Sequence, residues 1–462
     1  MIGFSEGFHD AAVAVVVDGQ IKFATHSERY SRLKHDKDLD GVATFLACCA
    51  NEDDITAFYE RPFYKRTRQL FAGQFKHAFG RRHLALEPTA YHSHHLSHAA
   101  AAFQTGPYSE AACVVVDSIG EWDTVSVWKA EMVNGRARYK KKFSKRYPYS
   151  IGLWYSALTK WAGLRPLDEE YIFMGMGAYG SPIYKNRART LLSMNNHKGI
   201  PIHLAGSKEN IAKSAEHVLY EVLSDIFKIA RKYSDNICYG GGVALNCLVN
   251  AKLQADHPNM WIMPNPGDAG GALGAALLSY GGKVPFSPYL GNMIYHKIDP
   301  KQVVDLLLRD GLCGVANGRA EFGPRALGNR SLLADPSTLE MKDRVNEIKR
   351  RQKFRPFAPV ILEEHAQQWF DMPKKESRYM SYVYQCKKPD KIPACIHADG
   401  SARVQTVPKD SQSIIRQILE CWFERTGCPV LLNTSLNVRG QPMVNTWDEA
   451  LEFAQIYGVV VL

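Results

Sequence analysis

Residues 111–120 of the chain read AACVVVDSIG, and this stretch decides the fold class. A run of small and β-branched apolar residues that ends in Asp117-Ser118 predicts a buried strand followed by a polar turn. Residues 124–130 predict the next strand, and Asn134-Gly135 predicts a hairpin turn after it. The stretch therefore opens a unit made of a strand, a turn and a second strand.

The same pattern occurs at the N-terminus. Residues 11–17 form an apolar run, Asp18-Gly19 follows, and residues 20–24 again look like a strand. An Asp-Gly pair between two such runs is a strong hairpin signal. The duplication predicts an α/β protein with two related α/β halves and a cleft between them.

Longer patterns divide the remaining chain. Helical spacing fills residues 150–162 and 211–233, and Pro285, Pro288 and Pro300 predict a linker over residues 283–300. We expect an N-terminal domain over residues 1–290 and a C-terminal domain over residues 300–462.

The composition is that of a globular protein. The 462 residues are 45% hydrophobic and 23% charged, which excludes a disordered, collagen-like or coiled-coil chain. The sequence has no apolar run long enough for a membrane span, and its start does not resemble a signal peptide. The ten cysteines form no CxxC pair, which predicts reduced, mostly buried thiols and a cytoplasmic location.

Positive charge is concentrated in two segments, residues 61–86 and 136–146. Together they hold fourteen of the 57 Lys and Arg residues and none of the 47 Asp and Glu residues, while the net charge is +10. The first segment also carries aromatic residues, namely Phe63, Tyr64, Phe71, Phe75 and Phe79. Cations neutralise phosphates and aromatic rings stack on bases, so both segments are candidates for contact with DNA or a nucleotide. The alternative is a solvated surface beside an ordinary apolar helix face.

Residues 92–98, HSHHLSH, precede a run of alanines that favours helix. His94 and His98 are then separated by one helical turn and lie within reach of one metal ion, whereas His95 points elsewhere. Asp268, at the head of a Gly/Ala-rich helix, is the natural distant carboxylate, and its alternative role is a helix N-cap. Two imidazoles favour Fe, Zn or Mn.

Glycines and acids mark two further candidate sites. Gly240, Gly241 and Gly242 would let the backbone approach a ligand closely, although three glycines also suit a tight turn. Acidic and imidazole groups near strand ends, at His9-Asp10 and at Asp117, suit contacts to a metal, a water or a hydroxyl.

The C-terminal region is rich in arginine. Arg325, Arg330 and Arg355 offer planar forks for phosphate oxygens, and they are flanked by Gly and Pro. Residues 432–437, LNTSLN, offer neutral donors and acceptors for a small carbonyl group. An anionic-ligand site is therefore expected here, with a surface salt-bridge network as the alternative.

Taken together, these segments resemble the nodulation-type O-carbamoyltransferase family, which includes the tobramycin and cephamycin carbamoyltransferases. The resemblance rests on ten segments in order: residues 3–12, 27–34, 94–103, 117–124, 174–180, 240–246, 265–274, 318–336, 354–359 and 433–440. Two positions depart from the family pattern, because residues 169–175 read EEYIFMG without the usual lysine and Ser118 replaces a glycine.

The resemblance implies a fold and a chemistry. It implies an actin-like ATPase domain of the TsaD-like type at the N-terminus, fused to an α/β YrdC-like domain. The C-terminal domain would make carbamoyl adenylate from carbamoyl phosphate and ATP, with Mg²⁺, and the N-terminal domain would pass the carbamoyl group to an acceptor hydroxyl. An iron ion, Fe²⁺ or another divalent transition metal, would lie on His94, His98 and Asp268.

The resemblance also distributes roles among the candidate residues. His9, Asp10 and Asp117 would be catalytic, with His9 or Asp10 as the general base. The nucleotide-binding candidates are Gly120, Glu121, Gly240, Gly241, Gly242 and Asn246. The candidates for carbamoyl phosphate and ATP in the C-terminal domain are Arg319, Arg325, Arg330, Ser331, Arg355, Asn433, Ser435 and Asn437.

The sequence leaves the acceptor open. It could be a 5-hydroxymethylpyrimidine in DNA or its nucleotide, reached through the two basic segments, or a small-molecule sugar or antibiotic hydroxyl. Two other classes are a tRNA threonylcarbamoyl transferase and a non-catalytic nucleic-acid-binding protein. We expect no membrane partner, and whether the chain forms a homodimer is not decided by its sequence.

Overall fold

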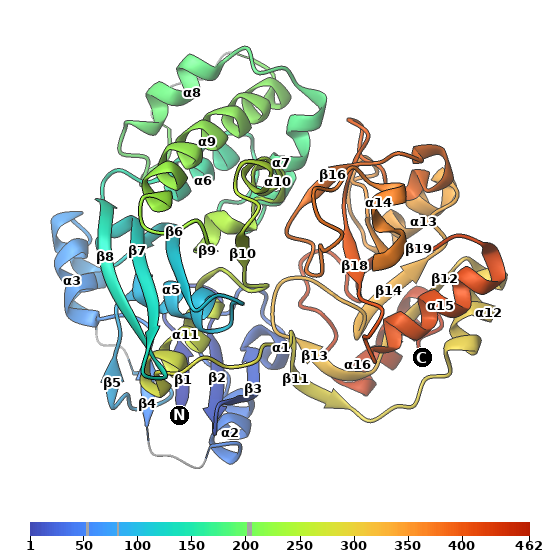
Figure 1. Cartoon of the computed structure of the whole chain (residues 1–462), viewed down its shortest axis with the longest axis horizontal. Helices are drawn as coiled ribbons and strands as arrows, with labels where there is room; N and C mark the ends of the chain where they lie inside the picture. The colour runs from blue at the N-terminus through green and yellow to red at the C-terminus, as the bar shows by residue number, and fades with distance from the viewer. Residues whose placement is uncertain (52–54, 81–82, 201–205) are drawn as a thin grey trace. The chain divides into compact units, whose positions relative to one another are not determined.

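The computed structural model describes residues 1–51, 55–80, 83–200 and 206–462. The chain forms two compact units. Unit 1 comprises Met1–Ser27 and His35–Phe286, and unit 2 comprises Glu28–Lys34 and Ser287–Leu462. Both units mix helices and strands (Figure 1), so the protein is of the α/β type that the sequence predicts.

The first sheet of unit 1 has five strands in the order β3-β2-β1-β4-β5. The strands are β1 (Ile2–Ser5), β2 (Ala12–Val17), β3 (Gln20–His26), β4 (Thr56–Phe58) and β5 (Ala90–Tyr91). β1, β2 and β3 pair antiparallel, while β1, β4 and β5 pair parallel. Val17 pairs with Gln20, so Asp18-Gly19 forms the predicted hairpin turn.

The second sheet of unit 1 repeats this topology, with the order β10-β9-β6-β7-β8. Its strands are β6 (Glu110–Gly120), β7 (Asp123–Val133), β8 (Arg136–Arg146), β9 (Ile237–Gly240) and β10 (Met260–Ile262). β6, β7 and β8 pair antiparallel, and β6, β9 and β10 pair parallel. Strand order and direction therefore match those of the first sheet, which is the duplication expected from residues 11–24 and 111–130.

Helices connect the strands of unit 1. They are α2 (Gly41–Cys49), α3 (Pro62–Phe71), α4 (Phe75–Phe79), α5 (His94–Gln104), α6 (Ile151–Trp161), α7 (Glu170–Met176), α8 (Lys185–Leu192), α9 (Lys208–Arg231), α10 (Cys247–Asp256) and α11 (Asp268–Tyr280), with 3₁₀ turns η1 (Gly177–Tyr179) and η2 (Gly242–Leu245). Helix α9 begins three residues before the predicted start at residue 211. The side chain of Ser207 accepts a hydrogen bond from the backbone of Asn210 and so fixes the earlier start.

Helices α5 and α11 pack against each other with very little side chain between them. A Cβ atom on Gly274 of α11 would lie 1.8 Å from the carbonyl oxygen of Ser97 in α5, so only glycine permits this approach. The apolar side of α5, with Ala99 and Phe103, packs on Val115 of β6. This packing brings the N-terminal turns of both helices close to the end of β6.

Unit 2 is built on a five-stranded sheet of order β12-β14-β19-β15-β18. Its elements are α1 (Glu28–Ser31), β11 (Tyr289–Ile294), α12 (Pro300–Asp310), β12 (Leu312–Ala316), β13 (Gly318–Glu321), β14 (Arg330–Ala334), α13 (Leu339–Ile348), β15 (Ala358–Leu362), η3 (Glu363–His365), α14 (Ala366–Trp369), β16 (Val383–Gln385), η4 (Pro389–Lys391), η5 (Pro393–Cys395), β17 (Ser401–Arg403), β18 (Gln405–Val407), α15 (Ile414–Thr426), β19 (Val430–Ser435) and α16 (Trp447–Tyr457). Leu333, Val360 and Leu431 from the sheet and Trp422 from α15 belong to its apolar core.

Two features of unit 2 differ from the sequence prediction. Strand β11 lies within residues 283–300, which their prolines predict as a linker, and it pairs antiparallel with β13. The prolines at 285 and 288 precede this strand and do not interrupt it. The segment Glu28–Lys34 also belongs to unit 2, where Arg32 pairs with Glu449 and donates a hydrogen bond to the carbonyl of Met443.

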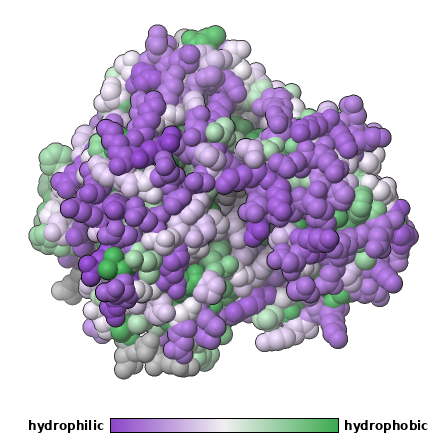
Figure 2. All heavy atoms as spheres, viewed as in Figure 1, coloured by the Kyte–Doolittle hydropathy of each residue, from purple (hydrophilic) through white to green (hydrophobic). Residues whose placement is uncertain are grey.

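On the face shown in Figure 2, hydrophobic residues form separate small patches among hydrophilic ones. All ten cysteines are unpaired, as expected for reduced thiols, but only five of them are buried, and Cys48 and Cys49 are exposed on α2. No helix in the described part of the chain combines the length and the hydropathy that a membrane span needs.

Candidate metal centre

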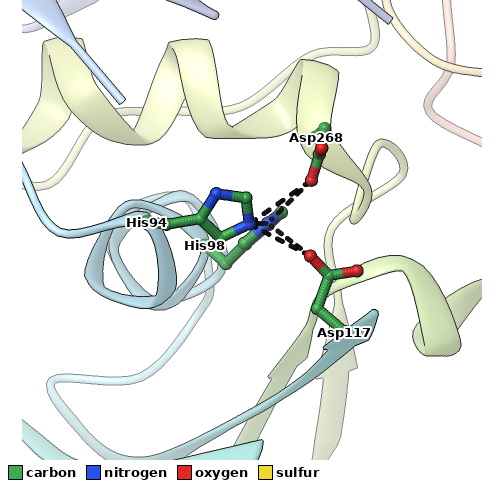
Figure 3. A group of neighbouring side chains, drawn as sticks. All are labelled: His94, His98, Asp117 and Asp268. Atoms are coloured by element: carbon green, nitrogen blue, oxygen red, sulfur yellow. Dashed lines mark hydrogen bonds and ion pairs between the residues drawn. The ribbon is translucent and has the colours of Figure 1, made fainter. Parts of the chain in front are cut away.

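Four buried side chains converge in unit 1: His94, His98, Asp117 and Asp268. One potential ligand atom from each lies within 4.8 Å of the others. Figure 3 shows both imidazoles leaving helix α5 and facing the two carboxylates, which come from β6 and from the first turn of α11. The predicted set of His94, His98 and Asp268 is thus brought together, and Asp117 joins it.

Asp117 is placed by an irregularity in β6. The pairing of β6 with β7 shifts register between Val116 and Gly120, so Asp117 lies in the strand and not in a turn as the sequence predicts. Its Oδ1 atom accepts a hydrogen bond of 3.1 Å from the backbone of Gly242. Its Oδ2 atom lies 3.0 Å from Nε2 of His94. One carboxylate oxygen is therefore anchored, and the other faces the histidines.

Asp268 begins helix α11, and its side chain does not cap that helix. The N-cap is Gly267, which lies outside the helix and makes no side-chain hydrogen bond. The Oδ1 atom of Asp268 lies 3.4 Å from Nε2 of both His94 and His98. The capping role that the sequence leaves open is therefore replaced by contacts to both histidines.

The distances match those of ligands around a common ion. The Nε2 atoms of His94 and His98 lie 3.1 Å apart, and His98 Nε2 lies 3.8 Å from Asp117 Oδ2. An ion bound tetrahedrally at about 2.1 Å holds its ligand atoms about 3.4 Å from one another. Two nitrogens and two carboxylate oxygens are a donor set that divalent transition metals accept. The residues present thus fit a metal ion.

The electrostatics of the four residues also call for a cation. Burial opposes ionisation of Asp117 and Asp268, yet contacts with His94 and His98 hold the pKa of both carboxyls below the usual value. Burial likewise favours a neutral His94, but Asp268 and Asp117 raise its pKa to about 10. Two buried carboxylates therefore draw positive charge into the centre, which a divalent ion would supply.

His95, which lies between the two ligand histidines in sequence, has a different role. His95 is buried, and its Nδ1 atom lies 2.8 Å from Oγ of Ser126, away from the metal centre as predicted. Burial lowers its pKa well below the usual value, so the ring is neutral. His94 is packed against the ring of Tyr59, 5.0 Å between centroids, while its Nδ1 atom is buried without a hydrogen-bond partner among the described residues.

Gly120 and Glu121, which the resemblance assigns to nucleotide binding, shape the metal centre in this structure. A Cβ atom on Gly120 would lie 2.3 Å from the ring of His94, so the strand can approach α5 only at a glycine. Glu121 is buried, forms an ion pair with Arg61, and accepts a hydrogen bond of 3.4 Å from the backbone of His94. Both residues fix the start of α5.

The glycines after β9 also contact this centre. Gly241 adopts a φ of 88°, and a Cβ atom there would lie 2.2 Å from the carbonyl oxygen of Val116. Gly240 ends β9, and the backbone N–H of Gly242 holds Asp117. Asn246 caps helix α10 by accepting a hydrogen bond from Val249, 3.2 Å long. These glycines let the backbone approach β6 closely, and their contact with a nucleotide stays a prediction.

His9 and Asp10 lie beside the metal centre. The Nδ1 atom of His9 is 2.9 Å from Oδ2 of Asp10, and its Nε2 atom is 3.9 Å from Oδ2 of Asp268. Burial lowers the pKa of His9, but Asp10 and Asp268 outweigh it and raise that pKa to about 9. The sequence-predicted catalytic residues of the N-terminal half are therefore one connected group.

In unit 2, a lysine that the sequence analysis did not single out organises the predicted anion site. The Nζ atom of Lys349 donates hydrogen bonds to Oγ of Ser435, at 3.1 Å, and to Oδ1 of Asn437, at 2.7 Å. Burial lowers the pKa of Lys349 well below its usual value, and Arg351 and Arg355 lower it further. A bound anion would relieve the repulsion among these neighbouring cations, so the arrangement favours anion binding.

Other predicted residues of unit 2 support the fold. Arg330 is fully buried, and its guanidinium donates to the backbone carbonyls of Asn292, Asn317, Gly318, Asn329 and Asn445. The guanidinium that the sequence predicts as a phosphate ligand therefore binds backbone carbonyls in the folded chain. Ser331 is buried in β14, and Asn433 donates to Ala326 and Gln405. Three predicted arginines, Arg319, Arg325 and Arg355, are half-buried.

Glu321 is a further residue without a sequence signal. It accepts backbone hydrogen bonds from Leu327, at 2.7 Å, and from Asn329, at 2.9 Å. The buried carboxylate thereby holds the glycine-rich loop that carries Arg325. Only the tertiary structure reveals this role, because an isolated Glu at a strand end has no distinguishing pattern.

Comparison with known families agrees with this arrangement. Residues 304–462 match the family described as "Carbamoyltransferase C-terminus", and residues 56–200 and 185–277 match "Carbamoyltransferase N-terminus". Among solved structures, T. kodakarensis HypF is similar over 60% of this chain and 47% of that chain, with 14% identity and a TM-score of 0.32, which is too low to support an argument.

Relatives are similar over nearly the whole chain. An uncharacterized protein, sll1178, from Synechocystis sp. is 30% identical over 97% of this chain and 93% of its own length. Nodulation protein U from Sinorhizobium fredii is 28% identical over 97% of this chain and 95% of its own length. Nodulation protein NolNO from the same organism is 28% identical over 96% and 76%, respectively. This chain belongs to the nodulation-type carbamoyltransferase family and is a carbamoyltransferase.

Proposed function

We propose that the chain is an ATP-dependent O-carbamoyltransferase that activates carbamoyl phosphate as carbamoyl adenylate and transfers the carbamoyl group to an acceptor hydroxyl. One observation supports the proposal most. In a chain of the carbamoyltransferase family, two histidines and two aspartates are buried together, and their potential ligand atoms lie within 4.8 Å of one another. The metal is Fe²⁺ or another divalent transition metal held by His94, His98 and Asp268, with Asp117 beside them.

The activation step belongs to unit 2 in this proposal. Water displaces phosphate from carbamoyl phosphate to leave carbamate. A carbamate oxygen then attacks the α-phosphorus of ATP, forming carbamoyl adenylate and releasing pyrophosphate. Lys349, Arg351 and Arg355 place positive charge close together, and the two arginines lower the pKa of the buried Lys349. These cations would bind the phosphate oxygens, and Mg²⁺ would accompany ATP.

The transfer step belongs to unit 1. The acceptor oxygen attacks the carbamoyl carbon, the bond to AMP breaks, and the acceptor proton must be removed. His9, hydrogen-bonded to Asp10 and 3.9 Å from Asp268, is placed to take that proton on Nε2 when its ring is neutral. A bound metal supplies positive charge for the oxygen that becomes negative during attack. The four ligand residues are buried, and an acyl adenylate there would be less exposed to hydrolysis than at an open surface.

The fold assignment forms part of the same proposal. The repeated five-stranded topology of unit 1 supports an actin-like, TsaD-like domain with two related halves. Unit 2 would be the YrdC-like domain, and the C-terminal family match over residues 304–462 favours an O-carbamoyltransferase over a tRNA threonylcarbamoyl transferase. The unpaired thiols are consistent with a cytoplasmic location.

The test separates the two steps. Purified chain is incubated with ATP and radiolabelled carbamoyl phosphate, and pyrophosphate, AMP and labelled product are measured with a panel of hydroxyl acceptors. The proposal expects pyrophosphate release that depends on carbamoyl phosphate, and label in at least one acceptor. Pyrophosphate release that is indifferent to carbamoyl phosphate would contradict it.

A specific observation favours a nucleic acid as the acceptor. Phe71 of α3, in the first basic segment, contacts the rings of Trp122 and Tyr147, with centroids 5.5 and 6.5 Å apart, and so lies beside the end of the second segment. Tyr147 follows β8 directly. The side chains of Phe71, Phe75 and Phe79 are 69%, 63% and 74% exposed, an unusual concentration of aromatic surface.

Not every basic residue of these two segments is available to bind a ligand. Arg61 pairs with Glu121, Lys65 with Glu60, and Lys141 with Asp123. Exposed cations remain at Arg66 and Lys76. The edge strand β8 adds three more, Arg136, Arg138 and Lys140, although charges on an edge strand also prevent pairing with other sheets.

Binding measurements decide between a polymer and a small acceptor. DNA with 5-hydroxymethylcytosine or 5-hydroxymethyluracil is compared with the free nucleotides, sugars and aminoglycosides. If DNA is the acceptor, affinity falls steeply with salt, and the triple variant Arg66→Ala, Phe75→Ala, Lys76→Ala binds it at least about tenfold more weakly. The control, Lys228→Ala with Arg231→Ala on α9, binds as the wild type does. If only a small molecule becomes labelled, the basic segments are solvated surface and do not bind the acceptor.

A further inference from the structure

A continuous series of side-chain contacts leads away from the metal centre of unit 1. Oδ2 of Asp268 lies 3.9 Å from Nε2 of His9, whose Nδ1 atom is 2.9 Å from Oδ2 of Asp10. Oδ1 of Asp10 lies 2.7 Å from Nδ1 of His35, and Nε2 of His35 lies 3.0 Å from Oδ1 of Asp168. Carboxylates and imidazoles thus alternate through five residues, and neither His35 nor Asp168 has been given a role above.

The backbone holds this series in place. Asp10 and His35 adopt φ values of 54° and 56°, in the left-handed region that non-glycine residues rarely occupy. The two loops are joined by backbone hydrogen bonds, from Gly7 to Lys37 at 2.6 Å and from Ala11 to Asp36 at 2.7 Å. A strained conformation at both ends of one side-chain contact persists only when the surrounding structure enforces it.

The hydrogen bonds fix the orientation of Asp10. Each of its carboxylate oxygens is held by a different imidazole, so the carboxylate cannot rotate without losing a contact. The contact with Asp10 places a proton on Nδ1 of His9, so Nε2 is the nitrogen that faces the metal centre and accepts a proton when the ring is neutral. His35 therefore controls which nitrogen of His9 is available, although it does not reach the centre itself.

Asp168 anchors the outer end. It lies 2.7 Å from the guanidinium of Arg165, and its side chain is only 13% exposed. Because a carboxylate oxygen only accepts, each of the two contacts of His35 forms through an N–H of its ring. A histidine held between two carboxylates cannot rotate freely and therefore transmits a defined position to Asp10.

We propose that His35, anchored by Asp168, is a positioning residue that holds Asp10 so that Nε2 of His9 faces the acceptor hydroxyl during carbamoyl transfer. The inference rests on the proposed function, because it assigns His9 as the base of the transfer step. It concerns transfer alone and predicts no effect on the formation of carbamoyl adenylate.

The test uses two replacements of one residue. In His35→Leu both hydrogen bonds are lost, whereas in His35→Asn the side-chain amide keeps a donor near Asp10 and loses the contact to Asp168. We expect His35→Leu to lower kcat for transfer about 100-fold, with pyrophosphate release, metal content and the KM for carbamoyl phosphate unchanged. His35→Asn should recover about tenfold of that loss. The matched control His217→Leu, on α9, should transfer at the wild-type rate.

A second measurement separates positioning from general damage. If His35 acts through His9, adding His35→Leu to His9→Ala lowers kcat no further, because effects on one catalytic unit do not add. Wild-type kcat in His35→Leu, or additive losses in the double variant, would overturn the inference. Failure of the wild-type chain to transfer from carbamoyl phosphate at all would overturn the proposed function, and this inference with it.

Discussion

The Nε2 atoms of His94 and His98 lie 3.1 Å apart, and each lies 3.4 Å from Oδ1 of Asp268. A helix can place two imidazoles on one face by spacing alone, but the third ligand comes from a helix that begins 170 residues later in the chain than His98. The close packing of α5 on α11 at Gly274 brings Asp268 within reach of both histidines. The metal centre is therefore a consequence of helix packing as much as of the histidine motif.

Removal of one imidazole tests the metal centre directly. His98→Gln should lower metal affinity about 10- to 100-fold, since a ligand nitrogen is lost while a buried polar side chain remains. His92→Gln provides the control, because His92 contacts Ser279 and lies outside the four converging residues. Metal bound per chain after dialysis, measured by mass spectrometry, gives the result. Equal metal content in both variants would show that His98 is not a metal ligand.

The packing of β6 against α5 gives a second prediction. In Gly120→Ala, the new Cβ atom would lie 2.3 Å from the ring of His94, so either the strand or the helix must move. We expect a loss of about 1–3 kcal/mol in the free energy of unfolding and weaker metal binding. Gly41→Ala is the control, since nothing lies within 4 Å of its Cβ position. Urea unfolding compares the two, and a Gly120→Ala protein as stable as Gly41→Ala would contradict the packing argument.

The buried lysine of unit 2 gives a third prediction. Lys349→Met keeps an unbranched side chain but removes the donor to Ser435 and Asn437. We expect the rate of pyrophosphate release to fall at least about 100-fold, because a charged group that contacts phosphate typically contributes several kcal/mol. Metal content should stay at the wild-type level, as should the activity of Lys301→Met on α12. Normal pyrophosphate release in Lys349→Met would place the anion site elsewhere.

Acid should weaken one contact of unit 2 in a predictable direction. Two hydrogen bonds from Arg416, of 2.9 and 2.7 Å, hold the pKa of Glu364 at about 2, below its usual 4.5. A lowered pKa in the folded state means that the pair stabilises fully above about pH 4.5 and progressively less as the pH falls towards 2.

Measurements of the free energy of unfolding of Glu364→Gln test this direction of the pH dependence. Near pH 7 the wild type should be more stable than the variant by about 1 kcal/mol at most, because the carboxylate is partly exposed. The difference should shrink at pH 3, where Glu364 is almost fully protonated in the unfolded chain but still largely ionised in the folded one. A difference that grows as the pH falls would show that the ion pair does not stabilise the folded state.

Local patterns predicted much of unit 1. The hairpins at Asp18-Gly19 and Asn134-Gly135, helix α6 and the one-turn spacing of His94 and His98 all depend on residues close in sequence. Asp268 was also accessible, because a glycine-rich helix with an acid at its head is a recognisable pattern. The duplicated sheet could be inferred from repeated strand openings, although its strand order could not.

What the sequence did not reveal depends on long-range contacts. Arg330 looks like a phosphate ligand beside its glycines, but five backbone carbonyls occupy its guanidinium in the folded chain. Lys349 lies in a basic run in which no lysine stands out, and only folding buries it against Ser435. His35 and Asp168 are 133 residues apart, so no local spacing connects them.

The most direct test of the central claim is carbamoyl transfer measured across a metal titration. Chain freed of metal by chelation is supplied with Fe²⁺, Zn²⁺ or Mn²⁺, and label transfer from carbamoyl phosphate is compared in the wild type and in Asp268→Ala. We expect transfer in the wild type that rises with one of these metals to one ion per chain. In Asp268→Ala we expect no transfer, while carbamoyl-phosphate-dependent pyrophosphate release continues. Transfer at the wild-type rate by Asp268→Ala, or by metal-free chain, would contradict it.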